Sequence, residues 1–417
     1  MNRVAVIFRR LGPYHHARLK AAGRVLEVIG IEMSGCDTVY AWDQVQGAEG
    51  FQRVVLFPDQ ELESMPAATL AERLTQALTD ANPQTVVVSG WAELESFAAL
   101  LWCATRRVPA VVMSESTAWD EKRSGWKEWV KGRVIGLCST ALAGGTPHAE
   151  YLVTLGMLRE RISLGYDAVD NDCFAQHAEE IRAQRSEIGS PQVSSLRSQP
   201  SPPPLPRTPF FLASARFVAK KNLPRLLEAF ARYRELASSS ALRTPHSARW
   251  SLVLLGDGPL RPALESQVSG LKLEDCVTMP GFKQYDELPA YYARAGAFIH
   301  ASTTEQWGLV VNEAMASGLP VLVSNRCGCA QDLVQEGVNG FTFDPCNLEQ
   351  MAQLMLKISA FNFPLSEFGA ASQRIISAWG PDRFAAGLSQ AVNAALNVPP
   401  PRASLLDRLL LKLLLLR

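Results

Sequence analysis

Residues 302–324 read STTEQWGLVVNEAMASGLPVLVS, and this stretch decides the fold class. The run GAFIHAS (296–302) before it and the run LPVLVS (319–324) at its end are short and apolar, as buried strands are. Between them, residues 308–317 are apolar on most faces and predict a buried helix that ends at Gly318. Strand, loop, helix and strand in this order predict a βαβ unit of a parallel sheet.

Two carboxylates lie within this unit. Glu305 follows the first strand in a loop, and Glu313 lies inside the apolar helix. A buried carboxylate without a partner is costly, and no lysine or arginine stands four residues away on either side of Glu313. Glu313 therefore needs a polar partner, which is either a ligand with hydroxyl groups or a hydrogen bond from a backbone turn of the protein itself.

The alternation of apolar runs and helical patterns continues outward in both directions. Further strands are predicted at residues 3–8, 53–57, 85–90, 109–113, 140–145, 209–215 and 250–256, with helices such as 65–78 and 92–107 between them. This alternation predicts two doubly wound, Rossmann-like α/β domains. Ligands of such sheets bind at the carboxyl ends of the strands, so a ligand shared by both sheets would lie in a cleft between the domains.

Changes in composition predict the domain boundaries. Residues 1–185 form the first domain, and residues 186–208, SEIGSPQVSSLRSQPSPPPLPRT, form a serine- and proline-rich linker. Residues 209–398 form the second domain, whose last helix we expect to pack back on the first. Residues 399–417 form a leucine-rich basic tail, too short to span a bilayer. Its segment 402–417 predicts either an interfacial helix on anionic lipid or a helix docked on a protein surface.

The composition argues against one class of function and favours a compartment. Lys and Arg together number 41, as do Asp and Glu, which disfavours a globally basic nucleic-acid binder. The eight cysteines form no Cys-x-x-Cys pair and are typical of small buried hydrophobes in a reducing compartment, although Cys327-Gly-Cys329 also suits a metal or redox site. The apolar run 4–8 is too short for a signal peptide, so we expect a cytoplasmic protein.

Two strand ends in the second predicted domain carry basic residues and glycines. Arg216 and Lys221 follow a strand and precede a helix, where helix N–H groups attract anions; the alternative is that Lys220 and Lys221 are a solvated surface pair. Gly256 and Gly258 lie in the turn GDGP after the next strand. The glycines permit close backbone approach by a ligand, although most such turns are only turns.

The ordered set of motifs resembles one enzyme family. Glu305-QWGLVVN-Glu313 resembles the Glu-x7-Glu motif of glycosyltransferase family 4, whose members have the GT-B fold, with two Rossmann-like domains facing each other across a donor and acceptor cleft. Arg216-FVAK-Lys221 resembles the Arg-x4-Lys pair of that family, and GDGP resembles its Gly-x-Gly-Pro turn. Residues 328–345 are similar to the stretch before its last helices. The resemblance covers much of the second predicted domain.

The resemblance implies a retaining, metal-independent glycosyltransferase that uses a nucleotide diphosphate sugar as donor. Glu313 would bind the ribose hydroxyls, and Glu305 would bind hydroxyls of the donor sugar. Arg216 and Lys221 would hold the diphosphate and stabilise its developing charge, which makes these two and Glu305 the expected catalytic residues. No metal and no cofactor are expected, because the basic side chains and the helix dipole neutralise the phosphates.

Further donor contacts are implied at backbone positions. The amides near Gly308 and Leu309, at a helix N-terminus, would assist with the phosphates. The remaining expected donor-binding residues are Gly12, Gly256, Gly258 and Trp307. Gly12 lies in the loop after the first predicted strand, where it would let the backbone approach a phosphate.

The first predicted domain matches the family less closely and would bind the acceptor. Tyr14, His15 and His16 follow the first strand and would face the cleft, where a histidine would contact the acceptor or remove a proton; the alternative is a helix-capping or core histidine. Many family members carry a histidine after the strand equivalent to 109–113. This chain has Glu115 there as a candidate substitute.

The expected acceptor is a glycan or a lipid-linked molecule of surface polysaccharide or glycolipid biosynthesis. The leucine-rich tail favours a membrane-borne acceptor and a peripheral position at the cytoplasmic face of a membrane. Two alternatives stay open. A GT-B-fold sugar-nucleotide epimerase would change the stereochemistry of a UDP-sugar without an acceptor, and an inactive GT-B binding subunit would bind nucleotide without turnover.

Overall fold

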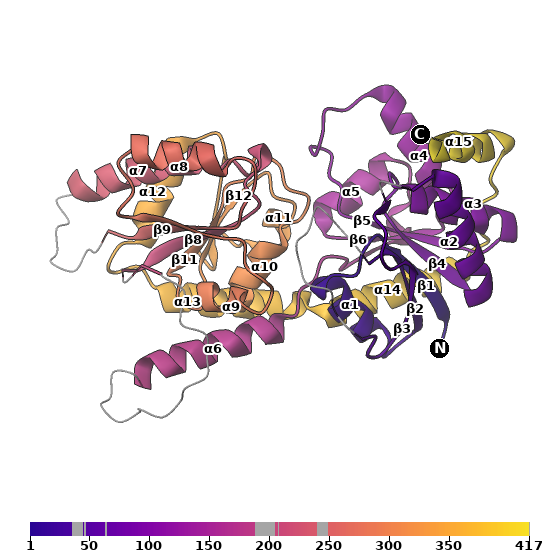
Figure 1. Ribbon diagram of the computed structural model, residues 1–417, viewed down its shortest axis with the longest axis horizontal. Helices are drawn as coiled ribbons and strands as arrows, with labels where there is room; N and C mark the ends of the chain where they lie inside the picture. The colour runs from indigo at the N-terminus through magenta and orange to yellow at the C-terminus, as the bar shows by residue number, and fades with distance from the viewer. Residues whose placement is uncertain are drawn as a thin grey trace. The chain divides into compact units, whose positions relative to one another are not determined.

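The computed structural model describes residues 1–35, 45, 47–62, 65–187, 205–206, 208–239 and 249–416. The chain divides into two compact units (Figure 1). The first consists of Met1–Asp170 and Trp379–Arg417, and the second consists of Asn171–Ala378. Each unit is built on one parallel β-sheet, as the Rossmann-like prediction requires.

The first unit contains a seven-stranded sheet in the order β3-β2-β1-β4-β5-β6-β7. The strands are β1 Arg3–Phe8, β2 Glu27–Ser34, β3 Gln52–Phe57, β4 Thr85–Ser89, β5 Ala110–Ser114, β6 Thr140–Ala143 and β7 Ile162–Leu164. Val4 of β1 lies opposite Val28 of β2 on one side and Thr85 of β4 on the other. Strand order reverses between β1 and β4, so the loops after these two strands lie at the topological switch point.

Helices cover both faces of the first sheet. They are α1 Pro13–Ala22, α2 Ala67–Ala81, α3 Leu94–Arg106, α4 Gly125–Ile135, α5 Thr146–Thr154, η2 Arg159–Arg161, α14 Pro381–Leu396 and α15 Leu405–Leu415. On one face α1 packs against α14, and on the other α2 packs against α3, which α15 also contacts. Side chains of β1 alternate between the faces: Val4 and Val6 share the cluster of α14, and Ala5 and Ile7 share the cluster of α2 and α3.

The end of the chain returns to the first unit. Phe384, Leu388 and Val392 of α14 belong to the apolar cluster beneath the first sheet. Gly387 lets α14 approach β7 closely, since a Cβ there would lie 2.3 Å from the carbonyl oxygen of Leu164. The second unit therefore ends at Ala378 rather than at the predicted boundary, because the apolar face of α14 is buried against the other sheet.

The first unit also ends earlier than predicted. Its boundary is Asp170 instead of 185, because α6 (Asn171–Glu187) belongs to the second unit. Arg182 of α6 donates from Nη2 to the carbonyl oxygen of Ser317 at 2.8 Å. The predicted serine- and proline-rich linker lies mostly outside the described residues.

The second unit contains a six-stranded parallel sheet in the order β10-β9-β8-β11-β12-β13. The strands are β8 Phe210–Ser214, β9 Ser251–Leu255, β10 Val277–Gly281, β11 Ala297–His300, β12 Val321–Ser324 and β13 Gly340–Phe343. The other helices of this unit are η3 Ala219–Lys221, α7 Leu223–Ser239, α8 Arg261–Gly270, α9 Leu288–Tyr292, α10 Leu309–Ala316, α11 Ala330–Leu333, α12 Leu348–Ile358, α13 Leu365–Ile376 and η4 Ser377–Trp379, which ends one residue into the first unit.

The helices of the second unit also form two layers. α7 packs against α8 and α12, whereas α10 packs against α6 and α13, and α6 packs against α9 (Figure 1). Strand order reverses between the neighbours β8 and β11, which places the loops after these strands at the switch point of the second sheet. The predicted strands around this point are confirmed, whereas sequence analysis did not list β2, β7, β10 and β13.

Candidate functional site

The candidate donor site lies at the switch point of the second sheet. Lys221 ends the short helix η3 after β8, and Glu305 lies in the loop after β11. These residues stand 84 positions apart in the chain, and the adjacency of β8 and β11 brings their side chains into an ion pair. Only 13% of the Lys221 side chain and 11% of the Glu305 side chain are exposed.

A hydrogen-bond network holds Glu305 in its charged form. Its Oε2 lies 3.1 Å from Nε2 of His300 and accepts a hydrogen bond of 3.1 Å from Oγ of Ser302. Burial raises the pKa of Glu305, but the hydrogen bond with His300 and the charge of Lys221 outweigh burial and hold the pKa well below its ordinary value. Burial lowers the pKa of His300, but its hydrogen bonds with Cys327 and Glu305 raise it overall. An anchored carboxylate of this kind can accept hydrogen bonds from hydroxyl groups.

Glu313 is fully buried in α10 and has a partner inside the protein. Its Oε2 accepts a hydrogen bond of 2.6 Å from the hydroxyl of Tyr292 in α9. Burial and the charge of Glu313 raise the pKa of Tyr292 well above its ordinary value, so the hydroxyl remains a donor. The polar partner that the sequence required is thus supplied in part by a side chain rather than by a backbone turn. Ribose binding by Glu313 stays a prediction.

The turn into α10 requires glycine. Gly308 is the N-cap residue with φ 102° and ψ 62°, a left-handed conformation that disfavours other residues. The amide of Leu309 belongs to the first turn of α10, where N–H groups lack helical partners. The indole of Trp307 is 1% exposed and donates from Nε1 to Oδ1 of Asn312 at 2.9 Å. Its indole is therefore a core group, and a donor contact at Trp307 would come from its backbone.

Arg216 is exposed in the loop after β8, and the GDGP turn packs against this loop. A Cβ on Gly256 would lie 2.0 Å from the carbonyl oxygen of Ala215, and one on Gly258 would lie 2.8 Å from that of Phe217. At both glycines, the atoms that lie close to the backbone are therefore carbonyl oxygens of the Arg216 loop. This close packing positions the loop. Direct contact of these glycines with a donor stays a prediction.

In the first unit, Gly12 and His15 form the start of α1. Nδ1 of His15 accepts a hydrogen bond of 3.4 Å from the amide of Gly12, and its ring lies 4.3 Å from the ring of Phe8. Burial and the charge of Arg18 lower the pKa of His15 to about 3. An imidazole of such low pKa is a weak base and its Nδ1 already accepts from Gly12, which fits the helix-capping alternative better than the role of proton acceptor. A Cβ on Gly12 would meet no heavy atom within 4 Å.

Tyr14 and His16 are half-buried on the same helix. The ring of His16 packs edge-to-face on Phe51 at a centroid distance of 5.5 Å. Burial and the charge of Arg53 lower the pKa of His16. Its Nε2 is buried and has no hydrogen-bond partner in the part of the chain that the structure describes. His16 therefore remains a candidate for a contact with the acceptor.

Glu115 lies after β5, close to a buried ion pair that sequence analysis did not single out. Nη2 of Arg18 lies 3.6 Å from Oδ1 of Asp167, and both side chains are 2% exposed. Burial and the charge of Glu115 raise the pKa of Asp167 well above its ordinary value. Asp167 lies shortly after β7, a strand that the sequence analysis did not list, so its place at a strand end gave no signal there.

Two further residues of the second unit, which are partners of the carboxylates, were not predicted from the sequence. His300 is the last residue of β11, and its place at a strand end five residues before Glu305 was a usable signal. Tyr292 ends the short helix α9, and no local pattern connects it with Glu313.

Among the residues that the structure describes, no group of three or more His, Cys, Asp or Glu side chains could hold a metal ion. The sequence does contain an Asp-x-Asp element, Asp170 to Asp172, at the start of α6. Asn171 between the two aspartates donates from Nδ2 to the carbonyl oxygen of Ile376 at 2.7 Å.

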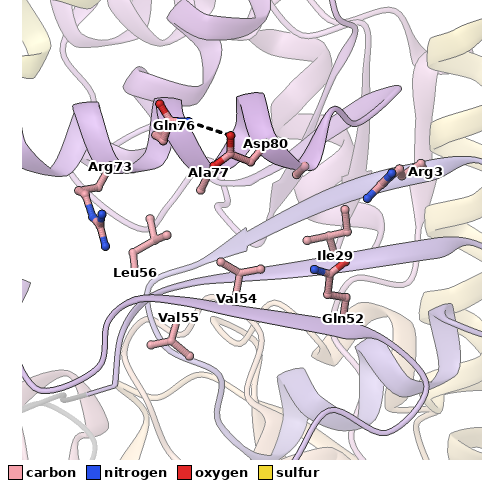
Figure 2. A pocket seen from close by; sticks show the side chains of 11 residues that line it. Arg3, Ile29, Gln52, Val54, Val55, Leu56, Arg73, Gln76, Ala77 and Asp80 are labelled. Carbon is pink, nitrogen blue, oxygen red and sulfur yellow. Dashed lines mark hydrogen bonds between the residues drawn. The ribbon is translucent and has the colours of Figure 1, made fainter.

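A pocket of about 290 Å³ lies along the edge of the first sheet, between β3 and α2 (Figure 2). It is lined by Arg3, Ile29, Gln52, Val54, Val55, Leu56, Arg73, Gln76, Ala77, Asp80 and Ala81. On the wall formed by α2, Gln76 donates a hydrogen bond of 2.7 Å to Asp80. None of the expected site residues lines this pocket, so it is separate from the candidate donor site.

Residues 198–366 match the model of the family described as "Glycosyl transferases group 1". This region contains both carboxylates, Arg216, Lys221 and the GDGP turn. The chain is 41% identical over 101 residues to the sulfoquinovosyl transferase SQD2 of Arabidopsis thaliana, covering 24% of this chain and 19% of that protein. It is 32% identical over 131 residues to the alpha-monoglucosyldiacylglycerol synthase of Acholeplasma laidlawii, covering 31% of this chain and 30% of that protein. The chain thus spans less than a third of the length of these curated relatives.

The fold extends the likeness to the whole chain. The crystal structure of Anabaena Alr3699/HepE in complex with UDP is similar with a TM-score of 0.66 over 94% of this chain and 100% of that chain, at 16% identity. The two parallel-sheet α/β domains of the present chain have the GT-B arrangement of these structural neighbours. The fold class predicted from the sequence is therefore confirmed. The family model thus matches a region of the second unit, and the likeness in fold extends over both units.

Proposed function

We propose that this chain is a glycosyltransferase that moves a sugar from a nucleotide diphosphate sugar to a glycan or lipid-linked acceptor, with retention of configuration and without a metal ion. The observation that carries the proposal is the Lys221–Glu305 pair, mostly buried at the switch point of the second sheet. It lies in the segment that matches the family model. Arg216 follows the same strand as Lys221 and adds a second cation.

In this proposal the donor diphosphate lies against Arg216 and Lys221. Their positive charge stabilises the negative charge that develops on the diphosphate as the glycosidic bond breaks. The amide of Leu309, at the N-terminus of α10, adds a partial positive charge. The loops that carry these groups are held by backbone hydrogen bonds, such as that of Thr303 N to Lys220 O at 2.9 Å, so little reorganisation is needed during the reaction.

The two carboxylates hold the two ends of the donor. Glu305, ionised and anchored, orients the sugar by accepting hydrogen bonds from its hydroxyls, while Glu313 and Tyr292 engage the ribose. Retention by attack on the same face as the departing diphosphate needs no covalent carboxylate, in contrast to the nucleophile of retaining glycosidases. Glu305 is therefore a donor-binding group and not a nucleophile.

The first donors to test are UDP-sugars, because UDP is bound in the Anabaena structure. A thermal-shift series with UDP-, GDP- and ADP-glucose ranks them, since a donor at 100 times its Kd stabilises the fold by about 2.7 kcal/mol. We expect one donor to raise the Tm of the wild type. Glu313→Gln and Arg216→Ala should lose most of that rise, whereas Glu349→Gln, at an exposed ion pair with Arg232, should keep it.

Further assays on the wild type and these variants test the remaining parts of the proposal. Equal donor stabilisation in wild type, Glu313→Gln and Arg216→Ala would contradict the assigned site. Loss of transfer in EDTA, restored by Mn²⁺, would contradict metal independence, and an inverted anomer by proton NMR would contradict retention. Epimerisation of a UDP-sugar without acceptor would favour the epimerase, and donor binding without turnover against any acceptor would favour the inactive binding subunit.

A lipid-linked acceptor is favoured by α15. Its Ser404 N-cap and the ion pair of Asp407 with Arg133 fix the helix on the first unit, where Leu411 is fully buried. Leu405, Leu409 and Leu413 recur every four residues and are 88%, 54% and 58% exposed. No helix among the described residues meets the length and hydropathy that a membrane span requires. We infer peripheral contact of this exposed leucine stripe with a membrane surface.

Co-sedimentation with vesicles tests this contact. Wild type should bind phosphatidylcholine vesicles that contain an anionic phospholipid more strongly than vesicles of phosphatidylcholine alone. The triple variant Leu405→Ser, Leu409→Ser, Leu413→Ser should remain folded and lose most of this binding. Leu158→Ser, at a leucine that is 51% exposed elsewhere in the first unit, is the matched control. Undiminished binding by the triple variant would remove α15 from the proposal.

A further inference from the structure

Cys327 and Cys329 form a dithiol next to the candidate donor site. Both thiols are buried in the loop after β12, and their sulfur atoms lie 3.5 Å apart. A disulfide has a bond length of about 2 Å, so the two sulfur atoms need to approach each other by about 1.5 Å to join.

The dithiol loop holds the loop that carries Glu305. The amide of Cys329 donates to the carbonyl oxygen of Trp307 at 3.2 Å, and Sγ of Cys327 donates to the same oxygen at 2.8 Å. A Cβ on Gly308 would lie only 2.8 Å from Sγ of Cys327. A change in the position of the Cys327 sulfur therefore acts directly on the turn between Glu305 and α10.

The two thiols are chemically unequal. Burial raises the pKa of Cys327, but its hydrogen bonds with Cys329 and His300 outweigh burial and lower the pKa to about 6. Burial and the neighbouring Cys327 raise the pKa of Cys329 well above its ordinary value. A buried cysteine without such partners behaves differently, since burial raises the pKa of Cys138 to about 12. A thiol of lowered pKa beside a second thiol is one feature of redox-sensitive cysteine pairs; because these two side chains are 2% and 0% exposed, only a small oxidant such as a peroxide suits them.

We propose that Cys327 and Cys329 are a redox-modification site, at which a peroxide joins the two residues in a reversible disulfide that disturbs the Glu305 loop. The formation of the disulfide rests on the geometry and the unequal acidity of the pair and does not depend on the proposed function. The effect of the disulfide on donor binding rests on the proposed function.

The chemistry balances with hydrogen peroxide as the oxidant. The Cys327 thiolate attacks one peroxide oxygen; an S–O bond forms, the O–O bond breaks, and hydroxide leaves and takes up a proton as water. The Cys329 sulfur then attacks the Cys327 sulfenic acid; the S–S bond forms, the S–O bond breaks, and the second oxygen leaves as water with the Cys329 proton. The dithiol loses two electrons, and the peroxide is reduced to two waters. A dithiol reductant such as dithiothreitol reverses the change by exchange.

The disulfide removes hydrogen bonds that the site uses. In the disulfide, Cys327 has neither the thiol proton that it donates to the Trp307 carbonyl oxygen nor the thiolate charge that it offers to His300. His300 also contacts Glu305, so the loss propagates to the carboxylate that is proposed to orient the donor sugar. We expect the Kd of the donor to rise about tenfold, as for one lost charge-assisted hydrogen bond.

Peptide mass measurement on the full-length chain tests the disulfide. Trypsin leaves Cys327, Cys329 and the exposed Cys346 on one peptide, 327–357, so the Cys346→Ser protein is used to give an unambiguous result. After peroxide treatment, denaturation and alkylation, the peptide should carry no alkyl group and weigh about 2 Da less than the unmodified dithiol. Treatment with dithiothreitol before alkylation should restore two alkylated cysteines.

Matched variants separate the possible results. Cys346→Ser,Cys329→Ser should form no disulfide, and Cys327 should be trapped as sulfenic acid by dimedone; circular dichroism checks that it is folded. If Cys327 and Cys329 remain fully alkylatable after peroxide treatment that oxidises Cys346 in the wild type, the proposal is overturned.

Donor affinity then tests the consequence. If the oxidised Cys346→Ser protein binds the donor as tightly as the reduced form, the proposed effect on the Glu305 loop is overturned although the disulfide forms. Failure of the reduced protein to bind any nucleotide sugar would instead contradict the proposed function and leave the peptide result intact.

Discussion

Each sheet carries an ion pair at its switch point, but the two pairs lie in opposite environments. In the first unit, Arg9 after β1 lies 3.5 Å from Glu93 after β4, and 39% and 51% of these side chains are exposed. In the second unit, Lys221 after β8 and Glu305 after β11 form the corresponding pair, which is mostly buried and also contacts His300. In each pair the cation follows one of the two strands at the switch point and the carboxylate follows the other.

The difference shows what burial adds to an ion pair. An exposed pair contributes about 0–1 kcal/mol, is screened by salt and leaves both side chains mobile in water. A buried pair with further hydrogen bonds has fixed positions and a stronger electrostatic effect on a neighbouring charge. A fixed, charged site suits the proposed binding of a diphosphate and its sugar by the second unit. A solvated strand end would suit the acceptor contacts that the family resemblance implies for the first unit.

Substitution of the two carboxylates should give the largest contrast. Glu305→Gln should lower kcat/KM for transfer by about 10²–10³-fold, because it removes the fixed charge that orients the donor sugar and holds Lys221. Glu93→Gln, the same change at the corresponding point of the first sheet, should alter kcat/KM by no more than about twofold. Steady-state kinetics with the donor found by thermal shift measures both. Similar losses in the two variants would show that burial does not distinguish the pairs.

Glycines after the strands give the second contrast. Gly256 follows β9 with φ 128°, and an added Cβ would lie 2.0 Å from the Ala215 carbonyl oxygen. Gly90 follows β4 with φ 83°, and an added Cβ would meet no heavy atom within 4 Å. Gly256→Ala should destabilise the protein by about 3 kcal/mol through strain and clash, and Gly90→Ala by about 1 kcal/mol through strain alone. Urea unfolding measures both, and equal costs would contradict the close packing of the Arg216 loop.

The pH dependence of stability gives the smallest contrast. The folded-state pKa of Glu305 is depressed, so its contribution is present above its unfolded pKa and lost as the pH falls through the folded value. The folded-state pKa of Asp167 is raised, so stability falls as the pH rises from its unfolded pKa toward the folded one. Asp167→Asn should therefore become more stable relative to wild type as the pH rises, by at most about 1.4 kcal/mol per pH unit. If the free energies of unfolding of Asp167→Asn and wild type differ by the same amount at every pH between the unfolded and folded pKa of Asp167, the raised pKa is contradicted.

Strand β2 shows where sequence analysis of the fold was limited. The central strands β1, β4, β5, β8, β9, β11 and β12 are continuous apolar runs, because both faces of a parallel sheet are buried. The sequence of β2, EVIGIEMS, contains Glu32, which would argue against burial. In the fold Glu32 is 1% exposed because Arg53 of β3 donates to it at 2.6 Å. A cross-strand ion pair of this kind depends on strand order, which no local pattern contains.

The candidate site also combines features that the local sequence predicts with contacts that only the fold creates. Spacing within a single βαβ unit placed Glu305 and Glu313 correctly on a strand-end loop and in a buried helix, since both positions follow from local periodicity. The partners of these carboxylates come from distant segments. Lys221 reaches Glu305 only because β8 and β11 are neighbours, and Tyr292 reaches Glu313 only because α9 and α10 lie in the same layer.

The sequence alone therefore determined the two α/β domains, the parallel sheets and the ordered motifs, because these depend on local hydrophobic periodicity and short spacings. The sequence suggested that the last helix packs back on the first domain, and the tertiary structure decided where the two units end, because the first sheet buries the apolar face of α14. The tertiary structure also decided the electrostatic character of each carboxylate. The pKa of a carboxyl group depends on burial and on charges within a few ångströms, and those neighbours are brought together by the fold.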